Sequence, residues 1–126
     1  MTTTNFENNF TTVEQSKRLL ELGVPADSAD CYYLREHPER IYVARESISK
    51  IRLRLHSTHA MPCWSAGQLL KICFICGGEK FIKDSTYMLR SFTGVSLSRR
   101  IDEMTDTIVR FMEDRDDIFD FTKLNN

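Results

Sequence analysis

The sequence is poor in the residue types that mark specialised protein classes. Its 126 residues include only four cysteines, three prolines and one tryptophan. Four cysteines do not make a dense disulfide framework, and a formal net charge of −1 gives no global attraction to nucleic acid or anionic membranes. The longest apolar run, Ile72 to Cys76, is far too short to span a bilayer. The polar first nine residues do not resemble a signal peptide, so we expect a cytoplasmic protein with reduced thiols and no membrane contact.

The rest of the composition is that of an ordinary globular protein. Hydrophobic residues make up 41% of the chain and charged residues 28%, which argues against wholesale disorder. A chain of this length can form a core that needs neither disulfides nor metals. We expect a flexible tail over residues 1–9, which are rich in threonine and asparagine, followed by a single compact α+β domain over 10–126.

The clearest local signal is a helix start beside the only tryptophan. Ser65 and Gln68 have the spacing of a capping box, in which the hydroxyl accepts from the Gln68 backbone N–H while the Gln68 side chain reaches back. This spacing predicts a helix over 66–75 that ends at the following pair of glycines. The adjacent Trp64 is a natural centre for the core, because a large aromatic ring fixed at a helix entrance buries much apolar surface.

Apolar residues at helical spacing predict two further long helices. The first runs over 12–22 and begins at a capping box, formed either by Thr12 with Gln15 or by the equivalent pair one residue earlier. Gly23 is expected to end it in the left-handed conformation. The second runs over 97–114, where the amphipathic pattern is the strongest in the chain.

The other elements follow from weaker patterns. We expect a shorter helix over 26–35 and a short strand over 41–43. The apolar residues of segment 45–56 fit both the spacing of a helix and the alternation of a strand. We favour a helix for its first half and assign no secondary structure to its second half. Residues 79–92 have the composition of two strands joined by a turn. The sequence thus predicts an α+β fold, with about four helices packed on a small antiparallel hairpin.

Two blocks of the sequence, Thr12 to Asp30 and Pro62 to Leu70, resemble an uncharacterised family of small proteins from gut anaerobic bacteria and their phages and mobile elements. The helix over 101–112 is a looser match, whereas 35–59 has no counterpart in that family. The resemblance covers somewhat under half of the chain. It implies a compact α+β domain of mobile-element origin, and it provides neither an activity nor catalytic residues.

A cysteine pair is the sharpest candidate for metal chemistry. Cys73 and Cys76 have the spacing of a zinc knuckle, and His56 with His59 offers a second pair of ligands. We favour the alternative of buried cysteines and surface histidines, because only one matched cysteine pair is present. A redox role is weaker still, since the dipole at a helix C-terminus opposes a thiolate. We therefore expect neither a metal nor a cofactor.

Two other functional patterns are incomplete. Gln15 to Ala29 has the length and turn glycine of a helix-turn-helix, but the second helix would open with Asp27 and Asp30, which repel phosphates. Ser65 lies in a stretch that superficially resembles a nucleophile elbow, yet the glycine required two residues earlier is missing. Its role as a helix cap explains this serine, so no enzyme is expected.

Charge is unevenly distributed along the chain. Basic residues gather over 35–59 and acidic residues over 102–120, most simply as two solvated faces. The functional alternative is that the basic segment binds an anionic group of a nucleotide, an RNA, a partner protein or a second copy of this chain. The residues assigned to this surface are Arg45, Lys50, Arg52 and Arg54. We expect a non-enzymatic binding or protein-interaction module. The alternative is a small nucleic-acid-associated domain, with or without zinc.

Overall fold

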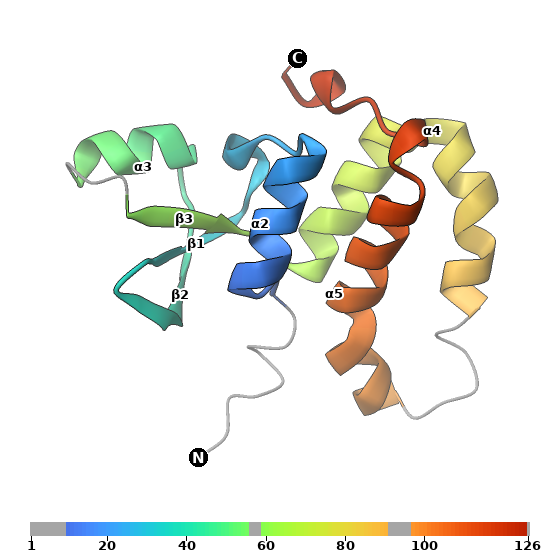
Figure 1. The fold of residues 1–126 in the computed structure, drawn as a ribbon, viewed down its shortest axis with the longest axis horizontal. Coiled ribbons are helices and arrows are strands. Elements are labelled where there is room, and N and C mark those ends of the chain that lie inside the picture. The colour runs from blue at the N-terminus through green and yellow to red at the C-terminus, as the bar shows by residue number, and fades with distance from the viewer. Residues whose placement is uncertain (1–9, 56–58, 91–96, 126) are drawn as a thin grey trace.

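The structure, a computed structural model, describes residues 10–55, 59–90 and 97–125, so the predicted tail lies outside the described residues. The elements in chain order are α2 (Val13–Leu22), η1 (Ala26–Ser28), β1 (Cys31–Leu34), β2 (His37–Val43), α3 (Ile48–Arg54), β3 (Ala60–Cys63), α4 (Ala66–Arg90), α5 (Leu97–Asp114), η2 (Asp116–Ile118) and η3 (Phe121–Asn125), where η marks a 3-10 helix. Figure 1 shows α2 between the sheet and the two long helices α4 and α5. The predicted α+β class is confirmed.

The sheet has three antiparallel strands in the order β2-β1-β3. Tyr32 of the central strand lies opposite Tyr42 on one side and Pro62 on the other. The strand predicted over 41–43 is confirmed as the end of β2. Helix α3 packs beside β3 through two buried isoleucines, Ile48 and Ile51.

Trp64 lies at the centre of the main core, as predicted. Its side chain is fully buried and packs in one cluster with residues of α2, α3, α4 and α5. Thr11 holds its backbone from both sides: the Thr11 N–H donates to the Trp64 carbonyl at 2.9 Å, and the Trp64 N–H donates to Thr11 Oγ1 at 3.0 Å. The first helix and the entrance to α4 are therefore joined directly.

The predicted ends of α2 are confirmed. Thr12 and Gln15 form the complete capping box, with the Gln15 N–H donating to Thr12 Oγ1 at 3.1 Å and the Thr12 N–H donating to Gln15 Oε1 at 2.9 Å. Gly23 ends the helix with φ 106°, a left-handed conformation that glycine adopts without a Cβ penalty. Both signals are local, which is why the sequence alone contains them.

The predicted hairpin over 79–92 is wrong, because α4 continues to Arg90 and the last two positions lie outside the described residues. Gly78 is non-helical, with φ 54° and ψ −134°, so the first part of α4 ends at the predicted glycine pair and a second helical stretch follows the bend (Figure 1). Beyond the kink, Phe81 is buried with its ring 5.6 Å from that of Phe111 in α5. This long-range aromatic packing stabilises a helix where composition alone favoured strands.

The helix predicted over 26–35 is also wrong, because a 3-10 turn and strand β1 take its place. Cys31 and Tyr33 are buried on one face of the strand, whereas Tyr32 and Leu34 are partly buried on the other. This two-residue period is that of a strand with both faces covered. Since no second α-helix follows α2 directly, the helix-turn-helix hypothesis loses its structural basis.

The ambiguous segment over 45–56 contains α3, so the helical choice for its first half is confirmed. Ser47 caps this helix by accepting from the Lys50 N–H at 3.2 Å. The final helix, α5, has the predicted bounds of 97–114. None of the helices within the described ranges is long and apolar enough to cross a membrane.

Candidate functional site

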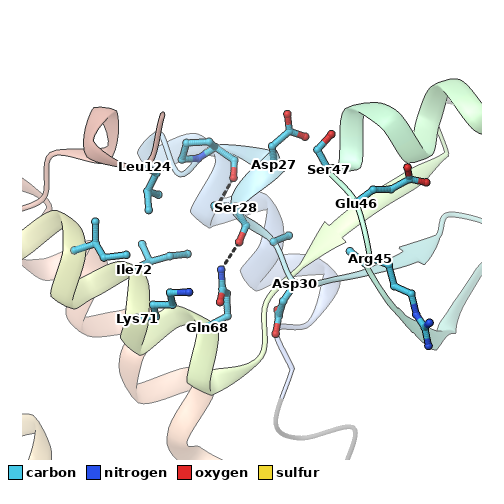
Figure 2. A pocket seen from close by; sticks show the side chains of 14 residues that line it. Asp27, Ser28, Asp30, Arg45, Glu46, Ser47, Gln68, Lys71, Ile72 and Leu124 are labelled. Atoms are coloured by element: carbon cyan, nitrogen blue, oxygen red, sulfur yellow. Dashed lines mark hydrogen bonds between the residues drawn. The ribbon is translucent and has the colours of Figure 1, made fainter. Parts of the chain in front are cut away.

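A cleft of about 500 Å³ opens between η1, the loop that leads into α3, and the first turns of α4. Arg45, one of the predicted binding residues, lines it. Figure 2 shows the side chains of Lys71 and Gln68 entering from α4, while Arg45 comes from the loop on the opposite side. The cleft is thus built from segments that are far apart in the sequence.

Hydrogen bonds fix η1 to the start of α4 and so set one wall of this cleft. Ser28 Oγ donates to the Pro25 carbonyl at 2.6 Å and accepts from Trp64 Nε1 at 3.1 Å. Gln68 Nε2 donates to the Ser28 carbonyl at 2.7 Å. This last bond replaces half of the predicted capping box: the Ser65 hydroxyl does accept from the Gln68 N–H, at 3.1 Å, but the Gln68 side chain reaches η1 instead of the cap.

The acidic side chains of the cleft already have donors from the protein itself. Asp27 accepts from the Ser49 backbone N–H at 2.9 Å and from its hydroxyl at 3.0 Å. Asp30 accepts from the Ser65 N–H at 3.0 Å and from its hydroxyl at 2.6 Å. The third acid, Glu46, forms an ion pair with an arginine of α3. These contacts hold the walls together and partly offset the negative charge.

The two cations of the cleft, unlike its acids, have no partner of opposite charge among the described residues. Arg45 and Lys71 are exposed, and no acidic side chain in the described part of the chain forms an ion pair with either. The floor of the cleft beside Lys71 is apolar and includes the buried Ile72 and the 41% exposed Ile75. The arrangement therefore offers positive charge beside apolar surface, which suits a group that combines a carboxylate with an apolar side chain.

The four predicted binding residues do not form one surface. Arg52 Nε donates to the Ala60 carbonyl at 2.9 Å, which ties α3 to β3. Arg54 Nε pairs with Glu46 at 2.7 Å, and this hydrogen bond raises the pKa of Arg54. The remaining two, Arg45 and Lys50, are exposed, but only the first lines the cleft. Whether any of the four binds a partner stays a prediction.

The candidate zinc ligands are separated in the structure. Cys73 and Cys76 are buried on α4, and burial raises the pKa of the Cys73 thiol to about 12. His59 pairs with Glu36 near the sheet, and His56 lies outside the described residues. In the described part of the chain, three or more His, Cys, Asp or Glu side chains nowhere gather as a metal would require. The pair Cys73 and Cys76 therefore has the character of core residues.

Sequence reasoning missed Lys71 as a member of the site. It is a single lysine on the exposed side of a helix, a position that usually means only contact with solvent. Its relation to Arg45 depends on how η1 and α3 fold over the start of α4, and no local pattern encodes that arrangement.

No family model matches the chain, no curated protein matches its sequence, and no solved structure matches its fold. The resemblance of Thr12–Asp30 and Pro62–Leu70 to a phage and mobile-element family therefore stays a prediction.

Proposed function

We propose that the protein is a non-enzymatic binding module whose cleft takes up a short segment of a partner protein that carries an acidic side chain next to apolar ones. One observation carries this proposal: Arg45 and Lys71 lack acidic partners among the described residues, whereas the acids of the same cleft are satisfied by internal donors. An incoming acidic segment meets a cation on either side of the cleft without displacing an existing ion pair.

The composition of the cleft favours a peptide over a nucleotide or RNA. Asp27, Asp30 and Glu46 line it as well, so a polyphosphate with several negative charges meets repulsion that a single carboxylate largely avoids. The apolar floor adds a favourable contact for aliphatic or aromatic side chains.

The test is selection of peptides from a random displayed library on the immobilised protein. The proposal predicts enrichment of peptides with an Asp or Glu beside apolar residues, and loss of that enrichment on the double variant Arg45→Glu/Lys71→Glu. Lys50→Glu is the matched control, because it reverses an exposed charge that does not line the cleft. Enrichment that is unchanged on the double variant, or peptides without acidic residues, contradicts the proposal.

The alternative function, a nucleic-acid-associated domain, is tested by measuring oligonucleotide binding. Binding of mixed single- and double-stranded oligonucleotides that weakens steeply with added salt supports this alternative and counts against the peptide cleft. As parts of the same proposal, we place the module in the cytoplasm and, following the resemblance, give it a mobile-element origin.

A further inference from the structure

Two cysteines of the sheet face each other directly, away from the cleft. Cys31 of β1 and Cys63 of β3 are register partners in the antiparallel pair. Their exposed fractions are 4% and 0%, and they form a small apolar cluster with Tyr33. Both are free thiols in this structure. No sequence pattern pairs them, since they are 32 positions apart and neither lies in a recognised motif.

The ladder shows that this pair has a separation suitable for a covalent bond. The Arg35 N–H donates to the His59 carbonyl at 2.9 Å, and the two-residue period of the ladder makes Cys31 and Cys63 a hydrogen-bonded pair as well. Such pairs have Cα atoms about 5.5 Å apart, within the range of about 4.4–6.8 Å seen in disulfides. The two side chains also pack in one small cluster, and the side-chain interaction with Cys31, together with burial, raises the pKa of the Cys63 thiol.

We propose that Cys31 and Cys63 are an oxidation site that forms a reversible disulfide across the sheet. The oxidant is a low-molecular-weight disulfide. One cysteine thiolate attacks it to form a mixed disulfide, which releases one small thiol. The thiolate of the second cysteine then attacks the protein sulfur, which forms the bond between Cys31 and Cys63 and releases the other small thiol. The protein loses two hydrogen atoms, and one oxidant molecule becomes two thiols.

Reversibility follows from thiol–disulfide exchange: an excess of a small thiol attacks the Cys31–Cys63 bond and reverses both steps. The burial of Cys31 and Cys63 makes the reaction slow, because the oxidant reaches a thiolate only when β3, a four-residue edge strand, opens locally.

The other two cysteines provide an internal comparison. Cys73 and Cys76 are one helical turn apart on α4, and Cβ atoms at this spacing are about 5–6 Å apart. A disulfide needs Cβ atoms about 3.5–4.5 Å apart, so this pair cannot close without distorting the helix. We therefore expect these two thiols to stay free under conditions that oxidise Cys31 and Cys63.

The test is incubation of the folded full chain with oxidised glutathione, followed by intact-mass measurement and trypsin mapping without reduction. Trypsin cuts after Arg35, Arg54 and Lys71, so Cys31 and Cys63 fall in different peptides, whereas Cys73 and Cys76 share one. The expected result is the loss of two hydrogen atoms, a linked Cys31–Cys63 peptide pair and unmodified Cys73 and Cys76. An excess of reduced glutathione should restore all four thiols.

Serine variants of the two cysteine pairs show which pair forms the bond. Cys31→Ser and Cys63→Ser should each abolish the mass loss, while Cys73→Ser/Cys76→Ser should retain it. An unchanged mass, a glutathione adduct that never resolves, or a bond within the Cys73–Cys76 peptide would overturn the proposal. So would a Cys31–Cys63 bond that forms only after denaturation, or one that resists reduced glutathione. Mapping of the unmodified sequence decides the matter even if a serine variant fails to fold.

Discussion

The indole Nε1 of Trp64 donates a hydrogen bond to Ser28 Oγ at 3.1 Å, across 36 positions of the chain. This bond connects the entrance of α4 to the 3-10 turn that forms one wall of the cleft. The indole ring is buried in the main core, and its N–H hydrogen bond to Ser28 positions η1 at the edge of the cleft. Stability of the core and the shape of the candidate site therefore depend on the same side chain.

We expect Trp64→Ala to lower the free energy of unfolding by about 3–5 kcal/mol, the usual cost of emptying a large buried aromatic site. Trp64→Phe should cost less, because a ring remains in the core and Ser28 keeps its bond to the Pro25 carbonyl. Urea unfolding followed by circular dichroism measures both. Equal losses for the two variants would mean that the ring volume contributes little, against this account.

A second prediction concerns the close approach of α4 to the C-terminal tail. A Cβ on Gly77 would lie 2.6 Å from Phe81 Cβ and 3.0 Å from Phe119 Cε1, so Gly77→Ala should destabilise the protein by about 1–3 kcal/mol through overpacking. Gly67→Ala is the matched control on the same helix: its Cβ meets nothing within 4 Å, and we expect a gain of about 0.5 kcal/mol. Thermal unfolding of the two variants should shift in opposite directions; shifts of the same sign would contradict the packing described here.

The predictions from sequence succeeded where the signal is local. The capping box of Thr12 and the left-handed Gly23 depend on residues within one helical turn, and both are found as expected. Prediction failed where a distant segment decides the outcome. Phe81 becomes helical through rings contributed by α5 and the tail, and β1 becomes a strand through pairing with β3. The candidate site shows the same difference between local and long-range signals. The basic segment predicted Arg45, but it could not show that Arg52 and Arg54 would bond to groups of the protein itself.

A third prediction follows from the ion pair of Arg18 and Glu113, which joins α2 to α5 with Arg18 Nε 2.9 Å from Glu113 Oε2. The hydrogen bond from Arg18 lowers the pKa of Glu113 in the folded state. Because the folded pKa lies below the unfolded one, the pair stabilises the protein fully above the unfolded pKa, and this contribution is lost as pH falls through the folded pKa. Both side chains are about one-third exposed, so solvent screening keeps the contribution small.

We therefore expect Glu113→Gln to lower the free energy of unfolding by about 0.5 kcal/mol at neutral pH, with the difference from the unmodified protein vanishing in acid. Urea unfolding across a pH series measures this difference. Asp114→Asn removes a neighbouring exposed charge for which no ion pair is found among the described residues, and it provides the background. A Glu113→Gln difference that stays constant down to strongly acidic pH would show that the ion pair is not its origin.

The most direct test of the central claim is the affinity of the most enriched library peptide for three proteins: the unmodified chain, Arg45→Glu/Lys71→Glu and Lys50→Glu. Fluorescence anisotropy of the labelled peptide should show at least about tenfold weaker binding to the double variant, equivalent to about 1.4 kcal/mol, and nearly unchanged binding to Lys50→Glu. Circular dichroism confirms that all three are folded. Equal affinities for the unmodified chain and the double variant would contradict the account, because the unpaired cations of the cleft would then have no part in binding.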